Sequence, residues 1–197
     1  TDNLTLNAAQ TVSSAGGTVT LQAGDDVMLT GTSKVSASGA ITIAGDVSSN
    51  DVAGTTITVM SQLTGASTTL LGGNGDDTYL MSYPSGATNS GSVSISDSAG
   101  NDSVIVTGTN NADELTLRSN GVLTRGANAG IEPINIPASI ERLTLNGLDG
   151  SDTFHVQPSL SLAVTIDGGA PALGAVGVPP GDTLDLDSLG NTFISNG

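Results

Sequence analysis

Residues 70–81 read LLGGNGDDTYLM, and this stretch decides the expected fold. One apolar run ends at Leu70 and Leu71, and a second begins at residue 78. Between them stand three glycines, an asparagine and two aspartates. Glycine readily adopts positive φ, and Asn and Asp favour turns, so the segment predicts a tight turn between two β-strands. The adjacent aspartates also concentrate negative charge at that turn.

Short runs in which apolar and polar residues alternate recur along the whole chain. This period of two, together with many β-branched residues, predicts β-strands separated by Gly, Asn, Asp and Ser. No window carries a helical apolar stripe, and only residues 137–143 (PASIERL) are compatible with one helical turn. The predicted fold class is therefore all-β. The expected strands are 4–6, 18–21, 27–30, 41–43, 56–60, 78–81, 92–96, 103–107, 114–117, 142–145, 153–156, 163–166 and 183–187.

Two all-β architectures compete for this pattern. A β-sandwich accommodates short strands, but its core usually holds large aromatic residues, and this chain of 197 residues has two Phe, two Tyr and no Trp. A right-handed parallel β-solenoid, of the β-helix or β-roll type, needs only stacked Val, Leu and Ile with Gly, Asn and Asp at its corners. We favour the solenoid, with ~20 residues per coil, about nine coils and a rod of roughly 45 Å.

A single elongated domain is expected over residues 1–197. Residues 1–65 are rich in Thr, Ser and Ala, whereas residues 66–197 carry most of the acidic turns. Residues 169–181 (GAPALGAVGVPPG) are interpreted as a flexible insertion that is stiff only at its two consecutive prolines. Because the chain has no initiator Met, we interpret it as a piece of a longer protein.

The charge balance excludes several classes of function. Nineteen acidic residues against four basic ones give a formal net charge of −15. Nucleic acid needs a basic stripe, which four scattered basic residues do not form, and the same balance argues against anionic membranes. No run is long and apolar enough for membrane insertion, and the absence of Cys excludes disulfides and thiol chemistry. The charge fits cation binding, or a surface kept soluble by repulsion.

Acidic turns recur along the chain, each anchored on an aspartate that precedes an apolar strand. The copies are AGDDVML (23–29), GGNGDDTYL (72–80), DSAGNDSVI (97–105), GTNNADELT (108–116), GLDGSDTFH (147–155) and PGDTLDL (180–186). Ca²⁺ takes oxygen ligands, and a glycine turn can aim its carbonyls at one point. The candidate metal ligands are therefore Asp26, Asp76, Asp77, Asp102, Asp113, Asp149, Asp152 and Asp182, together with Gly73, Asn74 and Gly75. The alternative is that these turns are corners only, with each Asp making an Asx-turn to its own backbone.

Residues 72–80 match the nonapeptide GGxGxDxUx, in which U is a large apolar residue. The segment resembles the calcium-binding repeats of RTX (haemolysin-type) proteins, which form a parallel β-roll in secreted bacterial toxins, proteases and adhesins. The resemblance implies that Asp77 binds Ca²⁺, that Tyr79 points inward, and that the glycines supply carbonyls and turn geometry. RTX repeats stand in tandem, whereas the other copies in this chain lose one or more glycines.

Residues 19–47 are similar in texture to the repeats of filamentous haemagglutinin-type adhesins, which are right-handed parallel β-helices. Both resemblances imply an extracellular segment of a large bacterial surface or secreted protein. The expected function is non-enzymatic: a Ca²⁺-stabilised structural or adhesion module. Its expected partners are calcium ions and a cell-surface or matrix polysaccharide or protein, and exposed solenoid ends predict end-to-end self-association.

The alternative function is a carbohydrate-active β-helix enzyme, a polysaccharide lyase or hydrolase fragment. Asp185 and Asp187 share one strand face and are the candidate carboxylate pair, although a solvated strand face explains them more simply. His155 is the single histidine and follows Phe154, so the alternation predicts Phe154 inside and His155 outside. Aromatic platforms for sugar rings are nearly missing, which favours the non-enzymatic role.

Overall fold

The computed structural model describes residues 2–47, 53–82, 90–126, 133–157, 159, 161–171 and 181–187. Most of the insertion expected over 169–181 lies outside this part of the chain. The described residues form β-strands and turns without a helix, so the all-β class is confirmed. Accordingly, they contain no helix long and apolar enough to cross a membrane.

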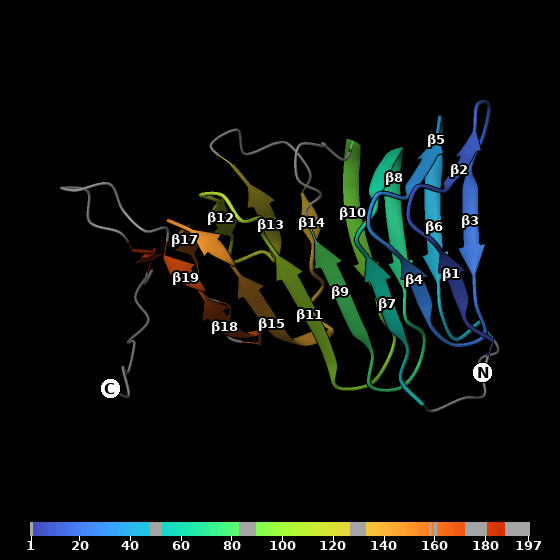
Figure 1. Ribbon diagram of the computed structural model, residues 1–197. Coiled ribbons are helices and arrows are strands. Elements are labelled where there is room, and N and C mark those ends of the chain that lie inside the picture. The colour runs from blue at the N-terminus through green and yellow to red at the C-terminus, as the bar shows by residue number, and fades with distance from the viewer. Residues whose placement is uncertain are drawn as a thin grey trace.

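One sheet has seven strands that lie side by side in chain order, and we call it the first sheet (Figure 1). All its pairs are parallel. The strands are β1 (Leu4–Leu6), β4 (Val27–Leu29), β7 (Thr56–Val59), β9 (Thr78–Ser82), β11 (Asp102–Thr107), β15 (Ile140–Asn146) and β18 (Ala163–Asp167).

The second sheet has eleven strands and is mixed. Among the described pairs, β13 pairs antiparallel with β12 on one side and with β14 on the other. We call these three strands the hairpin, and the other described pairs of this sheet are parallel. Two short strands, β16 (Asp149–Gly150) and β19 (Ala170–Pro171), pair separately. The eleven strands are β2 (Thr11–Ser14), β3 (Val19–Gln22), β5 (Lys34–Ala37), β6 (Ala40–Ala44), β8 (Gln62–Leu71), β10 (Ser90–Ser96), β12 (Glu114–Leu117), β13 (Val122–Arg125), β14 (Ile134–Asn135), β17 (Thr153–Val156) and β20 (Thr183–Leu186).

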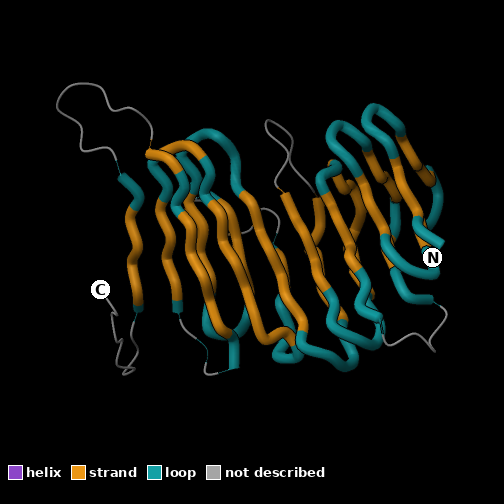
Figure 2. Tube along the Cα trace, turned by 60° about the horizontal axis from the view of Figure 1, so that its bottom comes forward, coloured by secondary structure: helices purple, strands orange, loops and turns teal. Residues whose placement is uncertain are grey.

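The chain alternates between the two sheets, and each return adds a strand beside the previous one. Figure 2 shows the connecting loops gathered along the two long edges, and Figure 1 places β1 and β18 at opposite ends of the first sheet. Leu4 pairs with Val27, 23 residues later, but Val104 pairs with Leu143, 39 residues later. The expected spacing of ~20 residues is therefore too short, because the connections vary in length and one of them contains the hairpin.

Every expected strand is present, with ends that differ by up to two residues. The helical turn allowed for residues 137–143 is wrong, because β15 begins at Ile140. The pairing of β15 with β11 shifts register between Asp102 and Ser103, which leaves Glu141 as an extra residue. Because of this bulge, the inward-facing residues Ile140 and Leu143 are three positions apart instead of two. A spacing of three is also found on one face of a helix, which is why the sequence looked compatible with a helical turn. Seven strands were not expected: the ten-residue β8, the shorter β2, β5, β13 and β14, and the two-residue β16 and β19.

The core consists of aliphatic rows contributed by both sheets. In the first sheet Val27, Ile57, Tyr79, Val104 and Leu143 occupy one register row, each at most 1% exposed. Burial of each such side chain contributes about 1.5–3 kcal/mol before the entropy of folding is counted. Tyr79 and Phe154 point inward as expected, whereas the exposed fraction of the His155 side chain is 39%.

Candidate metal centre

The chain passes from the second sheet to the first through one set of corners, which we call the acidic corner (residues 45–46, 72–77 and 97–102). Asp77 and Asp102 occupy equivalent positions directly before β9 and at the start of β11. Asp77 Oδ1 accepts the backbone N–H of Thr55 at 2.6 Å, and Asp102 Oδ1 accepts that of Asp77 at 2.8 Å. Each aspartate therefore joins its own corner to the preceding one.

The glycine five positions before such an aspartate is required by the carboxylate. A Cβ on Gly72 would lie 2.2 Å from Asp77 Oδ2, and a Cβ on Gly147 would lie 2.2 Å from Asp152 Oδ2. Gly108 stands in the same relation to Asp113, at 2.6 Å. The carboxylate oxygen fills the space that a side chain at the glycine position would need. Each of these turns therefore requires Gly at the fifth position before the aspartate.

Residues 97–102 depart from this rule, because Asp97 stands in the glycine position. Leu71 pairs with Ser96, so Asp97 follows the strand as Gly72 does. Asp97 Oδ2 accepts the hydroxyl of the fully buried Tyr79 at 2.7 Å. The carboxylate oxygens of Asp77, Asp97 and Asp102 then lie within 4.8 Å of one another. Three acidic side chains thus converge at one corner.

Asp46 adds a fourth carboxylate beside this group. It lies in the left-handed region with φ of 45°, which few residues other than glycine adopt but which Asp tolerates. Its Oδ2 would lie 3.0 Å from a Cβ placed on Gly73, and its negative charge acts on Asp77. Asp46 is 6% exposed, and neither of its carboxylate oxygens has a hydrogen-bond partner among the described residues.

Several buried oxygens at the acidic corner lack a partner. They are both oxygens of Asp46, Oδ2 of Asp77, Oδ1 of Asp97 and Oδ2 of Asp102. Asp77 and Asp102 are each 1% exposed. Among the residues that the structure describes, no ion pair with a basic side chain reaches these carboxylates. A buried charge without a partner is costly, so the cluster needs protons or a cation.

The pKa values follow from this environment. Burial raises the pKa of Asp77 to about 7; the hydrogen bond from Thr55 opposes the shift, and the neighbouring carboxylates add to it. Burial likewise raises the pKa of Asp102. Burial, and then the hydrogen bond to Asp97, raise the pKa of Tyr79, so its hydroxyl keeps its proton and donates. Carboxyl groups that hold a proton in the absence of a cation would release it when the cation binds.

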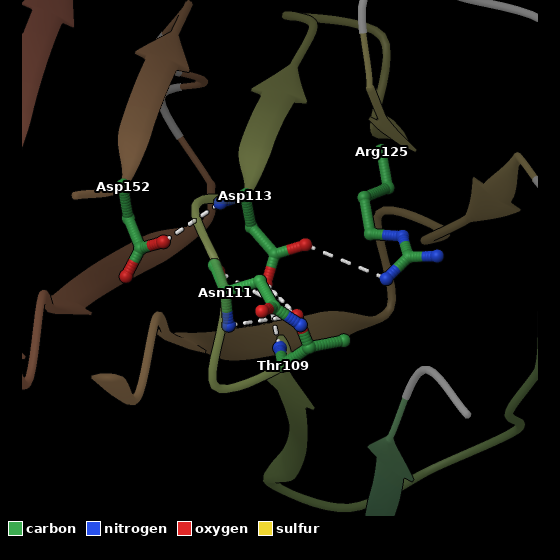
Figure 3. Close-up of polar contacts among 5 residues, drawn as sticks. All are labelled: Thr109, Asn111, Asp113, Arg125 and Asp152. Carbon is green, nitrogen blue, oxygen red and sulfur yellow. Dashed lines mark hydrogen bonds and ion pairs between the residues drawn. The ribbon is translucent and has the colours of Figure 1, made fainter. Parts of the chain in front are cut away.

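The opposite set of corners, from the first sheet to the second, is built on the same plan but carries its own counter-charge. Asp113 N–H donates to Asp152 Oδ1 at 2.8 Å, and Asp152 N–H donates to Asp182 Oδ1 at 2.9 Å. Figure 3 shows Asp113 between Asp152 and Arg125, whose Nη1 lies 3.4 Å from Asp113 Oδ1. Thr109 N–H and Oγ1 bond the other oxygen of Asp113. We call this the arginine corner (residues 108–113, 147–152 and Asp182).

The remaining expected ligands are not among the three carboxylates that converge. Asp76 is exposed and accepts the N–H of Asn101, so it faces away from Asp77 as consecutive strand-end residues do. Gly73 O and Asn74 Oδ1 both accept from Ser98, and Gly75 N–H donates to Ala99. Asp26 bonds Asn3 and Thr56 at the N-terminal end of the stack. Asp149 is exposed in β16.

The expectation of Asx-turns to the local backbone is wrong for the stacked aspartates. Asp77, Asp102 and Asp152 accept N–H groups that are 22, 25 and 39 positions away. Asp113 alone of these four bonds locally, to Thr109. The aspartates hold neighbouring corners together, which a purely local turn would not do.

Sequence reasoning missed Asp97 and Asp46 as candidate ligands. A usable signal existed for Asp97, since the fifth residue before the anchoring Asp is Gly at positions 72, 108 and 147 but Asp at 97. Asp46 is brought in only by the register of β6 against β8, where Ala44 pairs with Leu71. Chemically, the three converging carboxylates offer oxygen ligands only, with Asp46 beside them, and such a group suits a hard cation such as Ca²⁺ or Mg²⁺.

The carboxylate pair considered for catalysis is also placed by the structure. Asp185 is exposed and its Oδ2 lies 3.1 Å from His155 Nδ1, while Asp187 accepts from Gln157 Nε2 at 3.2 Å. Both carboxylates are therefore engaged with the neighbouring strand β17.

Comparison with protein-family models, with curated proteins and with solved structures finds no match to this chain.

Proposed function

We propose that this chain is a Ca²⁺-stabilised structural segment, built as a right-handed parallel β-solenoid, of a large extracellular bacterial protein of the RTX or haemagglutinin-like kind. Its role is non-enzymatic: it serves as a stalk or adhesion module.

Parallel pairing supports the solenoid over the sandwich. Successive strands of the first sheet pair in register and in chain order, with the second sheet adding a strand between them. The hairpin of β12, β13 and β14 is the antiparallel element among the described pairs. Sandwiches are built from antiparallel strands joined in Greek keys, and this chain order does not resemble one.

The unpaired buried oxygens of the acidic corner carry the proposal of a cation. At the opposite edge Asp152 Oδ2 is also buried without a partner, but Arg125 lies 3.4 Å from Asp113. Among the described residues three carboxylates converge only at the acidic corner, and no ion pair with a basic side chain reaches them. A bound divalent cation would supply there the positive charge that Arg125 supplies at the arginine corner. Ca²⁺ is favoured over Mg²⁺ because it accepts irregular sets of six to eight oxygens, while Mg²⁺ demands a near-ideal octahedron.

The proposed location outside the cell follows from the ion. Extracellular calcium modules bind at ~10⁻⁴–10⁻³ M, so such a site fills outside the cell and empties inside. A cation that binds only the folded state increases the free energy of unfolding, so the folded segment would become more stable on secretion. A net charge of −15 gives the chain strong self-repulsion, which bound cations offset.

Thermal unfolding followed by circular dichroism tests this function. At a Ca²⁺ concentration about 100 times the Kd, the linkage relation gives ~2.7 kcal/mol, or a rise of about 5–10 °C in Tm over the value in EDTA. Mg²⁺ at the same concentration is expected to give a smaller rise. Equal Tm values in EDTA and in Ca²⁺ would overturn the proposal and leave the aspartates as purely structural clamps.

A further inference from the structure

A hollow lies at the carboxyl ends of β12 and β17, on different strands from the acidic corner. It has two adjoining parts, of about 200 and about 300 Å³, which share Arg118 and Gln157. The smaller part has an apolar floor that includes Leu117 and Leu162 and a rim of hydroxyl and amide groups that includes Asn120 and Ser161. An apolar floor with a few convergent polar groups is the usual form of a small-ligand site.

Arg118 stands at the junction of the two parts on a fixed backbone. Its N–H donates to Val122 O at 2.9 Å and its carbonyl accepts the N–H of Gly121, so it occupies one side of a closed turn. The guanidinium itself has no hydrogen bond or ion pair within the described part of the chain, although it is one of only four basic side chains against nineteen acidic ones. By contrast, Arg125 pairs with Asp113, and Arg142 donates to Asn101 O.

The acidic residues that line the larger part already have partners. Asp185 lies 3.1 Å from His155, and Asp187 accepts from Gln157 Nε2, whose Oε1 in turn accepts the Ser119 N–H. Asp185 and Asp187 keep their negative charge, so an anion is expected in the smaller part, whose described lining has no acidic residue. There Arg118 has five N–H donors for an oxyanion.

We propose that this hollow binds a carboxylate-bearing saccharide unit. The carboxylate would accept two parallel N–H bonds from Arg118, a bidentate geometry that Arg can form and Lys cannot. The sugar hydroxyls would bond the amide and hydroxyl groups of Asn120, Gln157 and Ser161, and a C–H face would lie on the apolar floor near Leu162. The hollow opens to solvent, so it accepts one unit of a longer chain. The inference names the partner class for the proposed adhesion role, and it does not depend on cation binding.

The test is a titration of ¹⁵N-labelled protein with a galacturonate trisaccharide, followed by amide chemical shifts in saturating Ca²⁺. Maltotriose supplies the neutral sugar body and acetate supplies the carboxylate alone. The expected result is saturable shifts at Ser119, Gly121 and Gln157 with the galacturonate trisaccharide, and at least tenfold weaker binding of both controls. Arg118→Gln should weaken binding tenfold or more, while Lys34→Gln, which removes the same charge from β5, should leave it unchanged.

Three outcomes would overturn the proposal: no saturable shift, binding unaffected by Arg118→Gln, or acetate binding as tightly as the galacturonate trisaccharide. Repeating the titration in EDTA separates this site from the cation site. If Ca²⁺ is needed for folding, the Asp97→Gly variant is used in EDTA once its circular dichroism spectrum shows that it is folded there. If Ca²⁺ is not needed, the unchanged chain serves, and the saccharide result stands on its own.

Discussion

In EDTA, the protein is expected to lose stability as the pH rises from 5 to 8. Burial raises the pKa of Asp77 to about 7 from an ordinary value of 3.8. A group whose pKa is higher in the folded state stabilises that state below its unfolded pKa, and this contribution disappears as the pH passes the folded pKa. Asp102 and Asp152, whose pKa values are also raised, act in the same direction. The expected loss is on the order of 2 kcal/mol after allowance for solvent screening.

Urea unfolding at constant ionic strength measures this dependence. Ca²⁺ should flatten the profile, because a bound cation keeps Asp77 ionised without the cost of an isolated buried charge. Asp77→Asn should make the profile shallower in EDTA as well, since it removes one titrating group and leaves the contributions of Asp102 and Asp152. A stability that increases from pH 5 to pH 8 in EDTA would contradict the assigned environment of the acidic corner.

The variant Asp97→Gly is expected to abolish the response to Ca²⁺. It restores the glycine found at positions 72, 108 and 147, and it removes one of the three carboxylates that lie within 4.8 Å of one another. The ~2.7 kcal/mol expected from Ca²⁺ at 100 times the Kd should fall to nearly zero. In EDTA two opposing effects are expected: the repulsion among buried carboxylates falls, and the buried Tyr79 hydroxyl loses its acceptor. The test is therefore the difference in Tm between EDTA and Ca²⁺ for each variant.

Asp76→Gly is the matched control for this variant. Asp76 stands beside Asp77 in the chain but is exposed and bonds only the Asn101 N–H in the described structure. Its removal changes the net charge equally and should preserve the Ca²⁺ response. If both variants keep the response, the cation is not bound by Asp97; if both lose it, the effect is one of general charge.

Much of the fold follows from local pattern. Alternation with β-branched residues predicts the strands, and Tyr79, Phe154 and His155 lie on the sides that the period of two assigns to them. The prediction failed at Glu141, where a helical turn was allowed and the structure has a strand with a bulge. As the extra residue of a bulge, it spaces Ile140 and Leu143 as a helix would, and it bonds the Asp102 N–H at 2.7 Å. Only the pairing with β11 distinguishes the two possibilities.

The candidate site was predictable in part for a similar reason. Asp77 and Asp102 are marked by a motif that needs only neighbouring residues. Asp46 comes from a corner of different length, and its proximity to Asp77 depends on strand register across 27 positions, between Ala44 and Leu71. Arg125 reaches Asp113 only because β13 folds back beside β12. Contacts across such distances are set by tertiary pairing rather than by local sequence.

Terbium luminescence tests most directly whether a cation binds at the acidic corner. Tb³⁺ substitutes for Ca²⁺ at oxygen sites and is excited by a nearby tyrosine. Tyr79 bonds Asp97, whereas the other tyrosine, Tyr83, lies outside the described residues. We expect sensitised emission from the original chain and from Tyr83→Phe, displaced by Ca²⁺ and lost in Tyr79→Phe and in Asp97→Gly. Absence of emission, or emission that survives Tyr79→Phe, would contradict a cation centre at Asp77, Asp97 and Asp102.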